Sequence, residues 1–255
     1  MSRHIQELSP VSMAVFCLVL FELLQDKNVV IAKDSDRKSY SLAFEKIFEI
    51  ISAYAISADV EGVIWWTGKS RDRVSFLRQL NKVIRKTGYG TLKTVEQLEA
   101  NQVGVNDGGV DVLALTTLNG NVQPDAMCYL VGATYQKASR RGKIVGPAEL
   151  ERLRGFFLHL PNMTFQGVLS IPYPYVLAEA NDCRDQNCRY FPLGTIEKKI
   201  GHLNARDDMG ESKTYRKLLD SQMVIKGMGV VNQVSVVIGG GEIRMSDFMD
   251  ELGVA

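Results

Sequence analysis

The stretch "NDGGVDVLALTT", Asn106 to Thr117, decides the fold that we expect, because it joins a glycine turn to an apolar strand. The turn is Asp107-Gly108-Gly109, and the strand runs from Val110 to Thr116. Asp111 stands inside the strand, where strand alternation groups it with Leu113 and Leu115. Aspartate is depleted in strands and costly to bury as a charge, so this carboxylate needs a compensating partner. A divalent metal ion and a core arginine are the two alternatives.

The segments around this strand predict an α/β protein. A strand "AMCYLVGATYQKA" follows from Ala126 and forms a hairpin with the first, and "FQGVLSIPY" from Phe165 is a further strand. Helices are expected over "SYSLAFEKIFEIISAYAISAD" from Ser39 and over "GPAELERLRGFFLHL" from Gly146. "GVIWWTG" from Gly62 is either a short strand or a packed turn. This order predicts a mixed central β-sheet flanked by helices.

Basic residues are concentrated in two places, although the whole chain carries a formal charge of only +1. The segment from Thr67 to Lys93 has a net charge of +7, and "SRRGK" adds a second basic cluster. An amphipathic helix over Asp72 to Lys86 would carry the first cluster on one side, opposite an apolar side. A charged run is often only a solvated face, but it also suits contacts with the phosphates of DNA. The residues that we expect at the phosphates are Arg78, Lys82, Arg85, Arg140, Arg141 and Lys143.

The 255 residues suit one core with a small appendage. The loop-like text "NDCRDQNCRYFPLGT" from Asn181 predicts a boundary, with a core over residues 1–180 and a small C-terminal α+β extension over residues 181–255. A deeply packed helix is expected over Val11 to Gln25. The apolar run Met13 to Leu24 is too short for a membrane span and lacks the flanks of a signal peptide. We therefore expect a cytoplasmic protein with no membrane partner.

Four stretches taken together, "AFEKIFEII", "NDGGVDVLA", a strand ending in "YQK" and "FQGVLSI", resemble the Mrr-like branch of the restriction-endonuclease (PD-(D/E)xK) fold. The resemblance covers residues from Ser39 to Pro174. It implies that Asp111 and Glu45 bind Mg²⁺ or Mn²⁺ and that Lys137 activates water. The sequence departs from the family at Tyr135, where a glutamine or glutamate is usual. Gln136 would replace that residue if the strand carried a bulge.

The resemblance implies a metal-dependent endonuclease that hydrolyses phosphodiester bonds of DNA in bacterial restriction or anti-phage defence. A homodimer is expected, since two symmetric sites cut both strands of a duplex, and the chain could also be a subunit of a larger defence complex. The alternative is a catalytically degenerate nuclease-like subunit that binds nucleic acid or a partner protein without cleaving. A scaffold without a nucleic-acid role is the third reading, in which the basic face contacts an acidic protein.

Overall fold

The computed structural model describes residues 29–31, 34–58, 62–66, 77–78, 80–81, 84–85, 90–100, 110–116, 126–134, 141–159, 163–207, 235–238 and 241–244. The expected helix over Val11 to Gln25 lies outside these residues. Among the helices that are described, none combines the length and the apolar character needed to cross a membrane.

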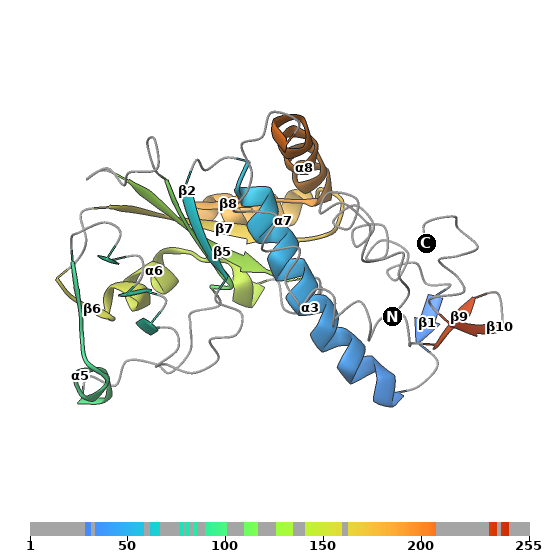
Figure 1. Cartoon of the computed structure of the whole chain (residues 1–255), viewed down its shortest axis with the longest axis horizontal. Helices are drawn as coiled ribbons and strands as arrows, with labels where there is room; N and C mark the ends of the chain where they lie inside the picture. Colours follow the sequence, from blue (N-terminus) through green and yellow to red (C-terminus); the bar gives the residue numbers. More distant parts are fainter. Residues whose placement is uncertain are drawn as a thin grey trace.

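A mixed five-stranded sheet forms the centre of the protein (Figure 1). Its strands, in spatial order, are β2 (Gly62–Trp66), β4 (Val112–Thr116), β5 (Met127–Ala133), β7 (Thr164–Ser170) and β8 (Cys188–Phe191). The first three strands are antiparallel, whereas β7 and β8 run parallel to β5. This order confirms the expected mixed α/β sheet flanked by helices. It also settles "GVIWW" as a strand.

Helix α3 (Asp34–Ile56) packs against β2, β4 and β5. Its sequence repeats apolar residues at helical spacing, and Ile47, Phe48, Ile51 and Tyr54 are all buried. This helix confirms the expectation from Ser39 onward and begins five residues earlier. Figure 1 shows it crossing the sheet beside α8 (Leu193–Asp207), which it also contacts.

Alternate residues of the strands build a second core. Leu113 and Leu115 of β4 pack there with Leu77, Leu80 and Ile84. The described residues between 77 and 85 are helical, with Arg78 and Arg85 exposed and these three apolar residues buried. The expected amphipathic helix is thus confirmed at these positions.

Helix α6 (Pro147–Arg154) begins at Gly146-Pro147 as expected, but it ends earlier than the sequence indicated. The segment after Gly155 forms β6 (Phe157–His159), which pairs with β3 (Thr91–Leu92) in a small two-stranded sheet. Helix α5 (Val95–Ala100) follows β3. Phe156 and Phe157 are buried in the second core, whereas Leu158 is exposed.

The central sheet continues past residue 180, where we expected the core to end. The segment from Asn181 was expected to be a loop, and this expectation was wrong. It completes α7 (Leu177–Asp185), forms β8 beside β7, and starts α8. Buried side chains at Cys183, Cys188, Phe191 and Ile196 explain the order there.

The two ends of the described chain meet in a separate sheet. Strands β1 (Val29–Ile31), β9 (Ser235–Ile238) and β10 (Gly241–Arg244) are antiparallel in the order β1-β9-β10. Figure 1 shows this small sheet apart from the central one.

Candidate functional site

Asp111 immediately precedes β4, where the strand pairing is irregular. Val112 is in register with Val131, and the Asp111 N–H also donates to the Val131 carbonyl oxygen at 2.8 Å. Two residues of one strand thus face one residue of the other, which is the arrangement of a β-bulge. As a result Val110 joins Leu113 and Leu115 in the second core. The simple alternation that we expected, with Asp111 on that face, was wrong.

The Asp111 carboxylate is compensated by a lysine. Lys143 Nζ donates to Oδ1 at 2.7 Å and to Oδ2 at 2.8 Å, and the Ala133 N–H donates to Oδ2 at 2.8 Å. The Asp111 side chain is 5% exposed and that of Lys143 27%. A buried carboxylate is tolerated when it is paired and hydrogen-bonded, so this ammonium answers the question that the apolar strand raised. The described cation beside Asp111 is therefore a lysine.

Lys143 is delivered by a short 3₁₀ turn, Arg141–Lys143. The next two residues, Ile144 and Val145, are buried and anchor the turn. We expected Lys143 among the phosphate contacts, but its ammonium is engaged with Asp111. The signal that sequence reasoning missed is this buried pair directly after the basic cluster.

The second strand of the hairpin ends sooner than the sequence indicated. Strand β5 stops at Ala133, and the buried Thr134 follows, with its N–H donating to the Ser170 carbonyl oxygen at 3.1 Å. The tripeptide "YQK" was expected to close this strand and lies beyond its end. Gln136 and Lys137, the expected metal ligand and the expected water-activating lysine, lie outside the described residues. Among the described residues, Lys143 contacts Asp111 beside the end of β5, where the Ala133 N–H also donates to the same carboxylate.

Two glutamates lie one turn apart on α3. Glu45 is half-buried and Glu49, one turn further on, is buried. Ser52, in the following turn, donates from its Oγ to Ser170 Oγ at 2.8 Å, which ties α3 to the end of β7. The part of the chain that the structure describes contains no group of three or more His, Cys, Asp or Glu that could hold a metal ion.

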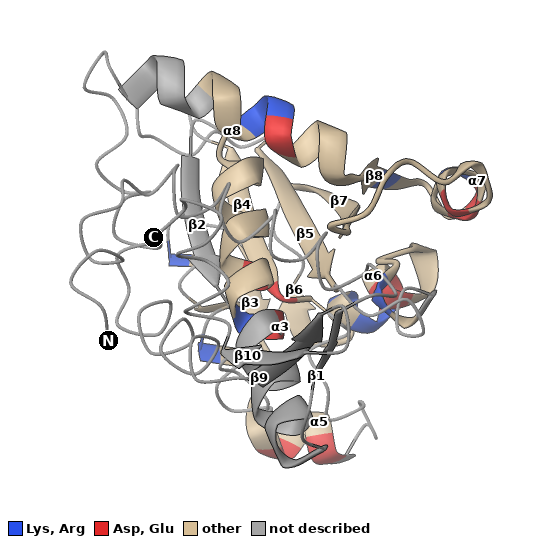
Figure 2. Ribbon diagram, turned by 90° about the vertical axis from the view of Figure 1, so that its right-hand side faces the viewer, with Lys and Arg blue, Asp and Glu red and all other residues tan. Residues whose placement is uncertain are grey.

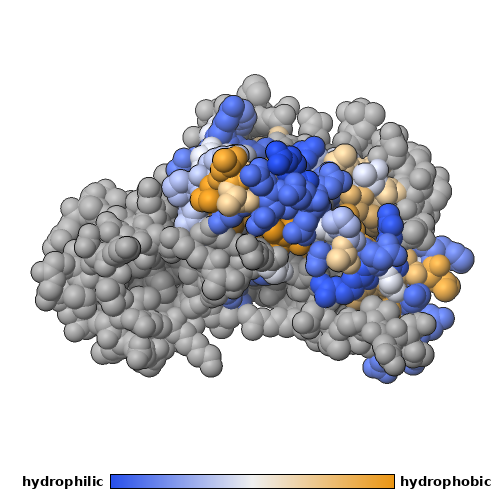
Figure 3. Space-filling model, turned by 180° about the vertical axis from the view of Figure 1, so that it is seen from behind, coloured by the Kyte–Doolittle hydropathy of each residue, from blue (hydrophilic) through white to orange (hydrophobic). Residues whose placement is uncertain are grey.

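The expected phosphate-binding residues are placed only in part. Arg78 and Arg85 are exposed on the amphipathic helix. Lys82 and Arg140 lie outside the described residues, and of Arg141 only the backbone is described. Figure 2 shows both signs of charge on α6 and α8, so these helices are not purely basic. Figure 3 shows hydrophilic residues gathered on the described part of one face, with smaller apolar patches between them.

Three cysteines are buried near the centre of the fold. Burial raises the pKa of Cys128, on β5, to about 12. A hydrogen bond from the Cys183 thiol lowers the pKa of Cys188, and the same bond together with burial raises the pKa of Cys183. Neutral thiols at Cys128 and Cys183 behave as small apolar side chains.

No protein-family model matches the chain, and no curated protein matches it. A solved structure that aligns with it is described as "MspJI Restriction Endonuclease in Complex with 27-mer Oligonucleotide". The alignment has 15% sequence identity and a TM-score of 0.29, and it covers 84% of this chain but 36% of that chain. This chain thus spans about a third of the length of that protein.

Proposed function

We propose that this chain is a DNA-binding protein on a restriction-endonuclease-like core, in which Lys143 neutralises the aspartate that a nuclease would use for its metal ion. The single observation that carries this proposal is the contact of Lys143 Nζ with both oxygens of Asp111. Mg²⁺ binds through carboxylate oxygens, so the ammonium and the ion compete for the same atoms. This supports the non-cleaving alternative.

The proposal that DNA is the partner is supported by the charge pattern. The segment from Thr67 to Lys93 carries a net charge of +7, and Arg78 and Arg85 project from one helix into solvent. Such residues bind phosphates without reading bases, which gives strong dependence on salt and weak dependence on sequence.

A second candidate is the metal-dependent endonuclease, in which Asp111 and Lys143 perform chemistry. It is favoured by the same pair, because a carboxylate and an ammonium at one strand end are the groups that phosphodiester hydrolysis requires. Binding of Mg²⁺ or Mn²⁺ would require Lys143 to leave one oxygen of Asp111, and Glu45 or Gln136 to join as ligands. Such an enzyme would act in the cytoplasm as a homodimer, or within a defence complex that restricts foreign DNA.

One set of measurements separates the two candidates. The full chain is titrated into fluorescent duplex DNA at several salt concentrations with EDTA, and then incubated with the same duplex and Mg²⁺ or Mn²⁺. The variants are Asp111→Asn and Lys143→Met, with Arg154→Met as the matched control, since Arg154 forms an exposed ion pair with Glu151.

Salt-sensitive binding without metal-dependent products supports the first candidate. Cleavage that Asp111→Asn and Lys143→Met abolish and Arg154→Met retains supports the second. A wild-type protein that binds no duplex even at low salt overturns both.

A further inference from the structure

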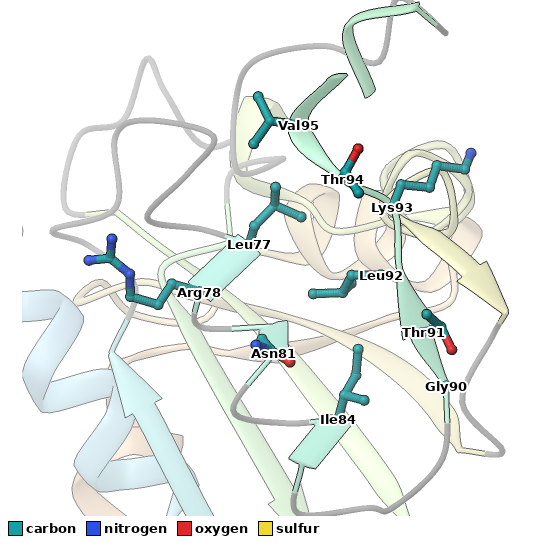
Figure 4. A pocket seen from close by; sticks show the side chains of 10 residues that line it. All are labelled: Leu77, Arg78, Asn81, Ile84, Gly90, Thr91, Leu92, Lys93, Thr94 and Val95. Atoms are coloured by element: carbon teal, nitrogen blue, oxygen red, sulfur yellow. The ribbon is translucent and has the colours of Figure 1, made fainter. Parts of the chain in front are cut away.

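A pocket of about 520 Å³ lies between the amphipathic helix and the segment from Gly90 to Val95. This volume is in the range of sites for small organic ligands. Figure 4 shows Leu77, Leu92 and Ile84 around its centre, with Asn81 beside them.

The wall formed by Gly90 to Val95 is held by backbone hydrogen bonds. Gly90 has φ 94°, a left-handed conformation that favours glycine, and the Lys93 N–H donates to the Phe156 carbonyl oxygen at 2.9 Å. Thr94 and Gln97 cap α5 reciprocally, with the Thr94 N–H donating to Gln97 Oε1 at 2.8 Å and the Gln97 N–H to Thr94 Oγ1 at 3.3 Å. Strand β3 is further fixed by its pairing with β6.

The opposite wall is formed by the amphipathic helix, whose Leu77 and Ile84 side chains are buried in the second core. Their helix presents Asn81 and Arg78 on the exposed side. Described residues on both sides of the pocket are thus anchored, Leu77 and Ile84 by burial and the segment from Gly90 to Val95 by hydrogen bonds.

The lining combines three chemistries in a definite arrangement. Aliphatic side chains form the centre, Asn81 offers an amide, and the two cations extend from opposite sides, Arg78 on one and Lys93 on the other (Figure 4). Among the described lining residues none is acidic. A complementary ligand has a flat, mostly apolar body that can accept and donate hydrogen bonds, with an anion on each side.

We propose that this pocket binds one unstacked nucleotide of a single DNA strand, with the base over the aliphatic centre and the flanking phosphates at Arg78 and Lys93. A nucleotide inside a strand has a phosphate on its 5′ side and another on its 3′ side, which matches two cations on opposite sides of the pocket. Asn81 supplies hydrogen bonds to the edge of the base. The inference rests on the proposed DNA binding and adds a site that holds single-stranded DNA.

The test uses the full chain with EDTA and two fluorescent probes, a short thymidine oligonucleotide and an abasic oligonucleotide of the same length. The variants are Arg78→Ala, Lys93→Ala and Asn81→Asp, the last of which places an anion in the pocket with almost no change of shape. Arg152→Ala and Lys198→Ala are the matched controls, because both residues are exposed on helices and neither lines the pocket. Thermal unfolding confirms that every variant is folded.

We expect the abasic probe to bind about tenfold more weakly, because it leaves the aliphatic centre uncovered. Arg78→Ala and Lys93→Ala should each lower the slope of log affinity against log salt by about 0.7, the value for one phosphate contact on a single strand. Asn81→Asp should weaken the thymidine probe more than either control does. Both controls should leave the slope unchanged.

Equal binding of the two probes overturns the base pocket, and so does a slope that Arg78→Ala and Lys93→Ala leave unchanged. If duplex DNA is still bound in a salt-dependent way, that result leaves the proposed function standing. Pocket-dependent binding of the thymidine probe by a protein that binds no duplex supports the pocket and contradicts the proposed binding of duplex DNA.

Discussion

The carbonyl oxygen of Val145 lies against Gly167 in the space that a Cβ atom would need. This close approach lets the segment after the 3₁₀ turn rest directly on β7. Lys143, two residues earlier, then reaches both oxygens of Asp111. Because Gly167 on β7 has no side chain, the segment that carries Lys143 can pack close to that strand. The Lys143 ammonium is thereby placed beside the Asp111 carboxylate, which adjoins β4.

Replacing Gly167 by alanine should therefore destabilise the protein. The new Cβ would collide with the backbone of Val145 rather than with a flexible side chain, so β7 or the turn must move. We expect the free energy of unfolding to fall by about 3 kcal/mol, as in overpacked cores. Chemical denaturation measures this loss.

Gly201 provides the matched control, because it lies in α8 and an added Cβ meets nothing within 4 Å. Gly201→Ala should raise the free energy of unfolding by up to about 1 kcal/mol, since alanine is the better helix former. Equal effects of the two substitutions would contradict the role of Gly167.

The Asp111–Lys143 pair should behave as a coupled unit. Lys143→Met leaves a buried carboxylate without its cation and should lower the free energy of unfolding by about 3 kcal/mol. The double variant Asp111→Asn, Lys143→Met should lose less than the sum of the two single variants, because no uncompensated charge remains. A thermodynamic cycle from urea denaturation provides the comparison.

The exposed pair Arg154–Glu151 is the control for that cycle. Its side chains are 55% and 73% exposed, and such a pair contributes at most about 1 kcal/mol. Additive losses at Asp111 and Lys143 would show that the two charges are independent.

Local patterns predicted the elements that carry their own periodicity. The helical spacing of Ile47, Phe48 and Ile51 predicted α3, and the apolar strands on both sides of a turn predicted the β4–β5 hairpin. The segment after Asn181 was missed because its elements are short and their polar residues outnumber the buried ones. These elements are stabilised by their contacts with β7 and α3.

The residues of the candidate site also differ in whether local sequence could predict them. Asp111 could be found because a charge in an apolar strand needs a partner. Lys143 could not be assigned as the partner of Asp111, since the two residues are 32 positions apart. The bulge that turns Asp111 away from the second core also depends on pairing with β5. Long-range contacts of this kind leave no periodic signal in the sequence.

The hydroxyl contact between Ser52 and Ser170 should contribute measurably to the docking of α3. Both side chains are buried and their Oγ atoms are 2.8 Å apart. Ser170→Ala removes the acceptor and should lower the free energy of unfolding by about 1–2 kcal/mol. The double variant Ser52→Ala, Ser170→Ala should recover part of that loss, because no unpaired hydroxyl remains. Urea denaturation tests both, and a double variant that is less stable than Ser170→Ala would argue against this contact.

Alkaline pH should destabilise the protein through Cys128. A thiol has an ordinary pKa of 9.0, and burial raises that of Cys128 to about 12. Between these values the unfolded chain loses the proton while the folded chain keeps it, so the stabilisation is complete below pH 9.0 and is lost as the pH rises toward 12. The loss attributable to this thiol should be about 1.4 kcal/mol per pH unit. Cys128→Ala should lack this pH-dependent loss. Because Cys183 and Cys188 are present in both proteins, the difference between the two curves of stability against pH isolates Cys128. Parallel curves across this range would show that the Cys128 thiol titrates alike in the folded and unfolded chains.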